Sequence, residues 1–360
     1  MKILIISPSL DPQKNVSGIS SVVNTIISHG HNTYIHYTFG STDQEIGKKN
    51  IKWAFRLLKS FINYRTFLKK QNIDLVHMNI PCNAKGILRE YIILSINKAC
   101  KKKNIGHLHG GEFLMKEPQN KLLLYCFKKI LYTSDKIIVL SNIEKESLNT
   151  LYGYANAEVL HNSIDIDNTS YKFFDKNVEQ KLQIIYLGRI HESKGIHDII
   201  DAFSKLYKEK AFRFVLCGTG EIENHAVEAF RKIMKDDFTF KGIVSGNNKT
   251  DAIISSDIFI LASRYGEGLP MALLETMGAG VIPIVTNDSS IKFVVKNNEN
   301  GILIEKRNPN DIHLKLKDLL NNPDKLNSLS VNARKTIAEN FDVKQMIKKL
   351  EQIYTDCLSS

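Results

Sequence analysis

The 360-residue chain lacks the cysteine pattern of a disulfide framework or a zinc site. Its five cysteines are odd in number and scattered, and no two of them form a C-x-x-C pair. We therefore expect a reducing compartment, the cytoplasm. No apolar run approaches the roughly 20 residues that a membrane-spanning helix needs, so any membrane association should be peripheral, on the cytoplasmic face.

The beginning of the chain lacks the features of a signal peptide. The apolar run from Ile3 to Ile6 is too short for a signal-peptide core, and no small-residue cleavage pattern follows it. We interpret this run as a first buried strand. The chain also lacks short-period repeats and low-complexity tracts, so no segment has to be disordered.

Charge is the most uneven property of the sequence. Residues 1–160 contain 22 Lys and Arg against 11 Asp and Glu, whereas residues 161–360 contain 27 of each kind. The first part of the chain therefore carries the whole net charge of +11. This asymmetry predicts that one domain binds an anionic partner, either nucleic acid or an acidic membrane surface.

Short β-branched runs alternate with longer helical patterns through the first half of the chain, as in a parallel sheet built from βαβ units. The predicted strands are 2–7, 33–37, 73–77, 105–108, 136–140 and 157–160, and the predicted helices are 19–28, 50–70, 85–102, 119–133 and 143–151.

The second half repeats this alternation. The predicted strands are 182–187, 212–217, 257–261, 282–285 and 302–304, and the helices are 196–208, 222–234, 247–255, 270–278, 310–320, 324–339 and 343–357. We therefore expect an α/β protein with two Rossmann-like, doubly wound domains facing a central cleft, where ligands of such sheets bind. The expected domains are residues 1–164 and 181–342, joined by a linker over 165–180. The helix near 343–357 should pack back onto the first domain.

Two glutamates with seven residues between them mark the second domain. Glu267 lies in a loop after a predicted strand, followed by Gly268 and Leu269, and Pro270 suits the first position of a helix. Amides at that helix start would favour a diphosphate. Glu275, on the same helix, could accept two hydrogen bonds from the hydroxyls of a ribose. An isolated pair of glutamates is more often a helix-end charge and a solvated side chain.

The whole stretch RYGEGLPMALLETMGAGVIPIVT, residues 264–286, resembles the signature of glycosyltransferase family 4. The resemblance implies a GT-B fold and a retaining glycosyltransferase of the type that builds bacterial surface polysaccharides such as capsule or lipopolysaccharide.

Further segments resemble the family in the right order. LGRIHESKG, residues 187–195, is similar to the segment whose Arg and Lys bind the donor diphosphate, which implies that role for Arg189 and Lys194. CGTGE, ending at Glu221, is similar to the family's Gly-x-Gly turn, and FKGI, ending at Ile243, resembles the segment that contacts the nucleobase. LHNSID, containing Asn162, resembles a Pro-Asn-Gly-x-Asp segment at the domain junction, with His161 and Ser163 in place of Pro and Gly.

The first domain resembles the family at two loops. The loop before the helix at 19–28 has Gly18 where the family usually has two glycines that approach the phosphate. His109, followed by Gly110 and Gly111, resembles the family's histidine near the sugar ring. A lone histidine at a strand end is usually structural. We expect His107 to point to the opposite face of the sheet and to be a core histidine.

The resemblance implies transfer of a hexose or N-acetylhexosamine from a nucleoside diphosphate sugar, UDP being favoured over GDP, to a hydroxyl of the acceptor. Arg189, Lys194 and the helix start would stabilise the diphosphate, Glu267 and His109 would position the sugar, and the leaving phosphate would take the proton. We expect no cofactor and no required metal. Asp165-Ile166-Asp167 superficially matches a metal motif of another glycosyltransferase fold, but it opens the linker rather than following a strand.

The basic first domain contains a helix with a surplus of apolar surface. Residues 48–70 carry several aromatic side chains, among them Trp53, on an apolar arc of roughly 200°, wider than one core contact uses. Together with residues 121–132 and Lys101–Lys103, this helix fits an anionic inner membrane surface, which would suit a lipid-linked oligosaccharide acceptor. A well-buried helix with a solvated basic face is the competing interpretation.

Three other functions compete with this interpretation. A nucleotide-sugar epimerase of the same fold would need no acceptor, and its family lacks the two-glutamate signature. A non-catalytic sugar-nucleotide-binding relative would share the site. Nucleic-acid binding is favoured only by charge, and no nucleic-acid motif accompanies it, so we expect no such partner.

Overall fold

The computed structural model describes residues 1–12, 15, 17–39, 51–171, 181–265, 267–288 and 290–359, and only the backbone of residues 51–54 and 323. The chain divides into two compact units. The first contains Met1–Asn162 and Val343–Ser360, and the second contains Ser163–Asp342. Each unit is an α/β domain with one parallel sheet.

Among the described residues, the sheet of the first unit has six parallel strands in the order β2-β1-β3-β4-β5-β6. These are β1 (Lys2–Ser7), β2 (Thr33–Thr38), β3 (Leu75–Ile80), β4 (Lys103–Leu108), β5 (Lys136–Val139) and β6 (Ala157–Val159). Residues of β1 and β3 are buried on both faces, as expected in a sheet covered by helices on both sides, and in β3 these buried residues include the polar His77 and Asn79.

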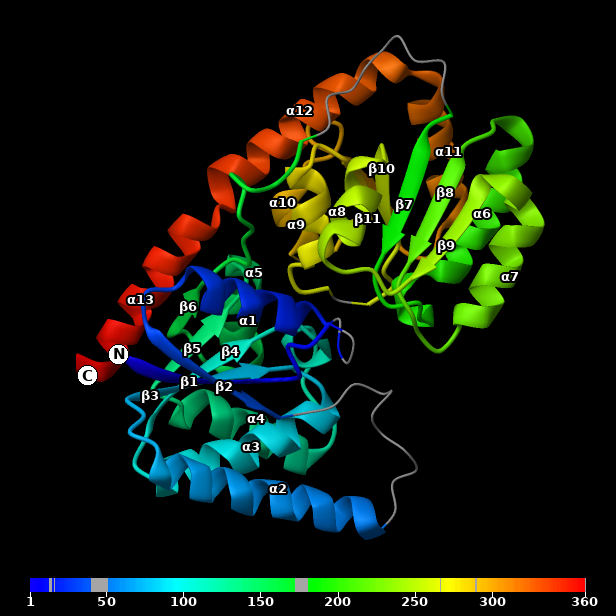
Figure 1. Ribbon diagram of the computed structural model, residues 1–360. Coiled ribbons are helices and arrows are strands. Elements are labelled where there is room, and N and C mark those ends of the chain that lie inside the picture. The colour runs from blue at the N-terminus through cyan, green and yellow to red at the C-terminus, as the bar shows by residue number, and fades with distance from the viewer. Residues whose placement is uncertain are drawn as a thin grey trace. The chain divides into compact units, whose positions relative to one another are not determined.

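Helices cover both faces of this sheet (Figure 1). On one face lie α2 (Ile51–Lys70), α3 (Ala84–Ala99) and α4 (Lys121–Thr133), and on the other lie α1 (Gly18–His29) and α13 (Val343–Ser359), while α5 (Asn142–Tyr152) packs beside β5 and β6. Side chains with even numbers on β3, such as Val76 and Met78, join the core formed with α2, α3 and α4. Odd-numbered ones, such as His77, face α13 because side chains alternate along a strand.

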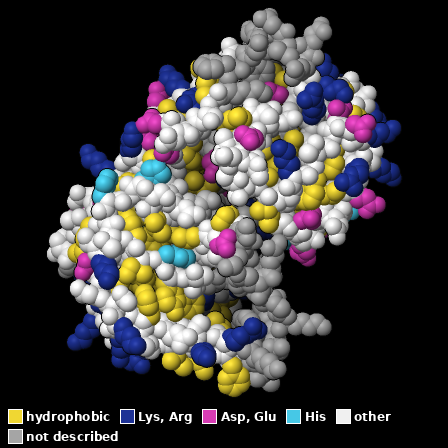
Figure 2. Space-filling view, viewed as in Figure 1, with side chains coloured by type: hydrophobic (Ala, Val, Ile, Leu, Met, Phe, Trp, Pro, Cys, Tyr) yellow, Lys and Arg dark blue, Asp and Glu magenta, His cyan; other side chains and the backbone are white. Residues whose placement is uncertain are grey.

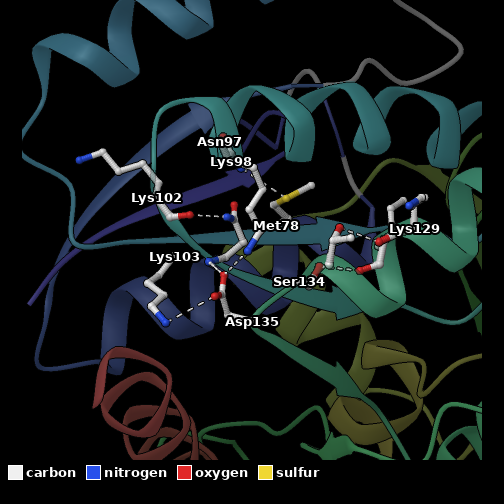
Figure 3. A network of polar contacts seen from close by, with 11 residues as sticks. Met78, Asn97, Lys98, Lys102, Lys103, Lys129, Ser134 and Asp135 are labelled. Atoms are coloured by element: carbon white, nitrogen blue, oxygen red, sulfur yellow. Dashed lines mark hydrogen bonds and ion pairs between the residues drawn. The ribbon is translucent and has the colours of Figure 1, made fainter. Parts of the chain in front are cut away.

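A polar network fixes the starts of β4 and β5 (Figure 3). The Asp135 carboxylate accepts hydrogen bonds from the Asn104 amide at 2.8 Å and from Lys98 Nζ at 3.0 Å, and Lys103 Nζ lies 3.5 Å away. Partial burial on its own would raise the pKa of Asp135. The hydrogen bonds and the lysine charges outweigh burial, so the pKa of Asp135 is lowered overall. The network stabilises the sheet edge at which β4 and β5 begin.

The second unit has six described parallel strands in the order β12-β11-β10-β7-β8-β9. They are β7 (Gln183–Leu187), β8 (Arg213–Cys217), β9 (Phe238–Gly242), β10 (Ile258–Leu261), β11 (Ile282–Thr286) and β12 (Ile302–Ile304). One face packs against α6 (Ile196–Glu209), α7 (Glu223–Met234) and α11 (Pro309–Asn321), and the other against α8 (Gly246–Ile254), α9 (Met271–Gly278), α10 (Ile291–Val294) and α12 (Pro323–Asn340).

The secondary structure follows the sequence pattern closely, with two omissions. β9 and the four-residue α10 were not predicted as elements. Of the predicted linker 165–180, residues 172–180 lie outside the described residues. Residues 48–50 of the predicted basic helix and the side chain of Trp53 lie outside them too. The first unit ends at Asn162, two residues before the predicted boundary, and α13 belongs to that unit.

Candidate functional site

Three loops of the second unit meet where β7, β8 and β10 end. The amide of Gly188 donates to Cys217 O at 3.1 Å and that of Ile190 to Thr219 O at 2.9 Å, while the amide of Arg264 donates to Ser193 O at 2.8 Å. The loops are thus tied to one another by their backbones at the carboxyl edge of the sheet, where ligands of parallel sheets bind.

Glycines make this close packing of loops feasible. Gly195 has a φ of +70°, and a Cβ there would lie 1.9 Å from Ala262 O. Gly218, with a φ of +132°, would place a Cβ 1.8 Å from Gly188 O, and Gly220 would place one 2.2 Å from Ile190 O. The Gly-x-Gly turn therefore has a structural role in the packing of these loops.

Glu267 is held at this edge by two side chains. The ammonium group of Lys194, from the 3₁₀ turn Glu192–Lys194, and the hydroxyl of Ser263 both donate to its carboxylate. The Glu267 side chain is only 11% exposed, and its own amide lies 3.4 Å from Asp288 Oδ2. Asp288 is buried and paired with Lys306 at 2.8 Å. Two residues predicted to bind the donor, Lys194 and Glu267, are thus in direct contact.

Glu275 lies on the second turn of α9 and is paired with a lysine that the sequence did not single out. Lys249 Nζ, on α8, lies 2.7 Å from Oε1 and 2.6 Å from Oε2 of Glu275. The Glu275 side chain is 22% exposed. Lys249 thus balances the charge of this carboxylate, whose Oε2 is buried.

The start of α9 differs from the prediction. Pro270 is the residue that caps the helix, with a ψ of +127°, and α9 begins at Met271 rather than at Pro270. The reason is local: Leu273 and Leu274 both donate to Pro270 O, so the first turn closes one residue later. Gly268 and Leu269 precede it in a stretch without regular secondary structure, Leu269 being buried.

The other predicted donor residues lie on the same set of loops. Arg189 follows β7 with an exposed side chain, and its carbonyl accepts a hydrogen bond from Tyr186 Oη at 2.6 Å. Glu221 is exposed beside His191 Nε2 at 3.4 Å. Ile243 directly follows β9 and is 40% exposed, an apolar surface suited to a flat ring.

Lys249, Ser263 and Asp288 are polar partners that sequence reasoning missed. Lys249 is separated from Glu275 by 26 residues, so no local pattern connects the two. Arg264, which lies in the signature stretch, has a different role. Its guanidinium binds both oxygens of buried Asp198, at 2.8 Å and 2.7 Å, and this pairing raises its pKa.

In the first unit, His109 follows β4 and begins a turn that requires glycine. Gly110 and Gly111 have φ values of +66° and +123°, and a Cβ on Gly111 would lie 2.6 Å from Cys82 O. His109 Nε2 is 2.7 Å from Asn79 Oδ1. Burial lowers the pKa of His109 to about 3, with a further contribution from His77, so the ring is neutral at physiological pH.

The prediction that His107 points away from His109 is wrong. The two rings stack with centroids 4.2 Å apart, because residues two apart on a strand share a face. His107 is buried, as predicted for a core histidine.

Gly18 opens α1 in exposed surroundings. A Cβ on it would meet no atom of the described residues within 4 Å. Ser17 caps the helix by accepting from the Ser20 amide at 3.3 Å. The structure thus leaves the single-glycine loop compatible with an approaching phosphate.

The junction residues have structural partners. Asn162 is buried at the end of the first unit, and His161 Nδ1 lies 2.6 Å from Leu140 O. In the second unit, Asp165 accepts from the amide of Asn168 at 3.2 Å and from its side chain at 2.6 Å, which closes a local turn. Asp165 of the Asp-x-Asp triplet is therefore engaged in this local turn. Over the described residues, no group of three or more His, Cys, Asp or Glu could hold a metal ion.

The comparisons with known proteins agree with this fold. The model of the "Glycosyltransferase Family 4" domain matches residues 25–168, and that of "Glycosyl transferases group 1" matches residues 167–336. An Escherichia coli protein named UDP-Gal:alpha-D-GlcNAc-diphosphoundecaprenol alpha-1,3-galactosyltransferase is 25% identical over 83% of this chain and 79% of its own. The capsular polysaccharide biosynthesis glycosyltransferase CapM of Staphylococcus aureus is 24% identical over 69% and 67%.

A solved structure supports the fold. Anabaena HepE in complex with UDP-glucose superposes with a TM-score of 0.78 at 14% identity, covering 99% of this chain and 100% of the other. The fold is therefore GT-B, with two Rossmann-like domains. The chain belongs to the glycosyltransferases with a family 4 first domain and a group 1 second domain, and it is a transferase enzyme.

Proposed function

We propose that this glycosyltransferase moves a hexose or N-acetylhexosamine from a nucleoside diphosphate sugar to a hydroxyl of a lipid-linked oligosaccharide, with retention at the anomeric carbon. The observation that carries the proposal is the arrangement around α9. Glu267 is held by Lys194 and Ser263, and Glu275, eight residues further along, is held by Lys249.

This arrangement fits the two halves of a sugar nucleotide. Glu275 can accept from the two hydroxyls of a ribose, and the exposed Ile243 offers a surface for the base. Lys194 and Arg189 supply positive charge for the diphosphate, and Glu267 accepts hydrogen bonds from hydroxyls of the sugar. UDP is the favoured nucleotide, because HepE was solved with UDP-glucose and the E. coli relative is named for UDP-Gal.

In the proposed reaction the bond between the anomeric carbon and the diphosphate oxygen breaks, and the acceptor oxygen bonds to the same face of that carbon. The proton of the acceptor hydroxyl passes to the leaving diphosphate. Lys194 and Arg189 offset the charge that develops there. His109 is neutral at physiological pH. It therefore positions the sugar by a hydrogen bond and does not act as a general acid.

A thermal-shift screen over UDP, GDP and ADP sugars tests the donor, followed by hydrolysis and transfer assays with the best binder. Proton NMR of the product then gives the anomeric configuration. An isomerised sugar without acceptor would indicate an epimerase, and binding without turnover would indicate a non-catalytic relative. Transfer that requires a divalent cation after treatment with a chelator would contradict the expected independence of metal.

The proposed acceptor rests on the surface of the first unit. Helix α13 adds three lysines and two acidic residues to residues 1–162, so this unit has a net charge of +12 and the second unit −1. On α2, Phe61, Tyr64 and Leu68 are buried. A second apolar stripe on a neighbouring face of the helix is exposed, with Phe55 at 68%, Leu58 at 57% and Ile62 at 58%.

Basic side chains flank this stripe. Lys59, Arg65 and Lys69 are exposed on α2, and Leu122 and Tyr125 add exposed apolar surface on α4. Figure 2 shows hydrophobic side chains beside Lys and Arg over the part of the unit where α2 lies. No described helix is both long and apolar enough to cross a bilayer. Such a surface suits the headgroup region of an anionic leaflet. Failure to sediment with phosphatidylglycerol vesicles at low salt would contradict membrane binding.

A further inference from the structure

A buried chain of ring contacts connects helix α13 to the interior of the first sheet. The hydroxyl of Tyr354 lies 2.7 Å from His77 Nδ1, and His77 Nε2 lies 3.1 Å from His107 Nδ1. All three side chains are at most 1% exposed. The contacts run from α13 across β3 to β4.

The chain continues from His107 to His109 by a close contact between tilted rings. The two imidazoles lie 4.2 Å apart between centroids, with 35° between their planes. The His109 ring therefore has His107 packed along it and Asn79 at its Nε2. Its orientation depends on both neighbours.

Asn79 also defines which nitrogen of His109 carries the proton. Its Nδ2 donates to Ile6 O at 3.0 Å, so its Oδ1 is the atom that faces His109 Nε2 at 2.7 Å. An amide oxygen only accepts, so Nε2 must donate. In the neutral ring, Nδ1 is then the acceptor, a tautomer assigned from the hydrogen-bond network.

Aliphatic side chains would fill these positions at lower cost. Burial disfavours the charged forms of His77 and His107, and His107 Nε2 has no hydrogen-bond partner among the described residues. An orphaned polar atom in a core lowers stability. Such local costs are typical of functional rather than purely structural positions.

We propose that Tyr354 is a positioning residue for His109. Its hydroxyl orients the His77 and His107 rings, and these hold the His109 ring with Nδ1 free to accept a hydrogen bond from the substrate. The inference rests on the proposed role of His109 beside the sugar. It makes the docking of α13 a condition for a correctly oriented His109.

The test is Tyr354→Phe, which keeps the ring and removes only the hydroxyl. Nitrogen-15 NMR of the imidazoles should show one tautomer of His109, protonated at Nε2, in the wild-type protein. We expect shifted or mixed His109 tautomer signals in the variant, a three- to tenfold lower kcat and an unchanged donor KM. Wild-type His109 signals together with wild-type kcat would overturn the proposal.

Tyr64→Phe is the matched control. Tyr64 is equally buried in the same unit, and its hydroxyl donates to Asn97 Oδ1 at 2.5 Å on the opposite face of the sheet. It should lose stability yet keep the His109 signals and kcat. Equal changes of the His109 signals and kcat in both variants would show a general loss of packing and overturn the specific role of Tyr354.

A second variant covers the case in which Tyr354→Phe does not fold. His107→Phe keeps a ring stacked on His109 and removes the bond to His77, and it should shift the His109 tautomer signals. Unchanged signals in His107→Phe would overturn the proposal. The NMR result is independent of the proposed function, because a protein that transfers no sugar would still report the tautomer of His109.

Discussion

Lys249 Nζ lies within 2.7 Å of both carboxylate oxygens of Glu275, although the two residues belong to different helices. The pairing lowers the cost of a partly buried carboxylate in the absence of a ligand. It also preorganises the acceptor atoms that a ribose diol would need, so the carboxylate does not have to reorient when the nucleotide binds.

Replacing Glu275 by Ala should weaken UDP binding. Loss of hydrogen bonds to a charged acceptor removes about 2 kcal/mol, or roughly a 30-fold increase in Kd. Isothermal titration with UDP measures this. Lys249→Met should have a smaller effect, because it leaves the acceptor oxygens in place. Glu299→Ala, on an exposed glutamate of the same unit, is the control. An unchanged Kd in Glu275→Ala would remove the ribose assignment.

Replacing His109 by Asn should mainly reduce turnover. A single well-placed hydrogen-bonding group is worth about 100-fold in kcat, while the nucleotide contacts in the second unit are untouched. Steady-state kinetics and UDP titration separate the two effects. His31→Asn, at a histidine whose side chain is 82% exposed, should leave kcat unchanged. Intact turnover in His109→Asn would exclude His109 from the site.

The buried histidines should make stability fall in acid. Burial lowers the pKa of His77 and His109 to about 3 and that of His107 well below its usual value. The folded rings stay neutral while the unfolded chain takes up protons below about pH 6.5. Stability is therefore complete above that pH and falls toward pH 3, by about 1.4 kcal/mol per pH unit for each histidine.

Urea unfolding of the wild type and of His107→Phe between pH 7 and pH 5 measures this effect. Below the pKa of the unfolded histidines, the slope for the variant should be shallower by about one proton. Other titrating groups, such as carboxylates, contribute equally to the pH slopes of both proteins, so their contributions cancel in the comparison. Parallel slopes would show that His107 takes up its proton in the folded protein too.

Two glycine substitutions should differ in their effect on stability. Gly195→Ala adds a methyl group 1.9 Å from Ala262 O at a positive φ, so we expect at least about 1–2 kcal/mol of destabilisation. Gly18→Ala meets no atom and should change stability by less than about 0.5 kcal/mol. If the Gly18 amide approaches the diphosphate, Gly18→Ala should lower turnover at an unchanged Tm. Normal kinetics would remove Gly18 from the site.

Charge reversal on α2 should weaken membrane binding. Each basic residue near an anionic surface contributes about 1 kcal/mol, so Lys59→Glu with Arg65→Glu should reduce the vesicle-bound fraction at least about tenfold at low salt. Arg231→Glu with Lys232→Glu makes the same change of charge on α7 of the second unit and serves as the control. Equal losses in both pairs would indicate that net charge matters rather than this surface.

The sequence predicted the strands well because buried parallel strands are nearly uniform apolar runs, as in Lys2–Ser7. It missed β9 because Phe238–Gly242 has exposed polar positions at a sheet edge. Of the candidate site, it found Glu267 and Glu275, whose spacing is local. It could not find Lys249 or Asp288, which reach the glutamates only through tertiary packing. The stacking of His107 on His109 follows from strand alternation, so this contact could have been predicted.

Helix α13 belongs to the first unit although the whole second unit precedes it in the chain. During synthesis, residues 1–162 leave the ribosome long before Val343–Ser359 can cover their sheet. The second unit is continuous and can complete its fold earlier, although it starts later. Until α13 docks, the part of that face with His77 and His107 lacks the helix that covers it in the folded protein. The order of synthesis thus makes this helix the final step in the maturation of the domain that contains His109.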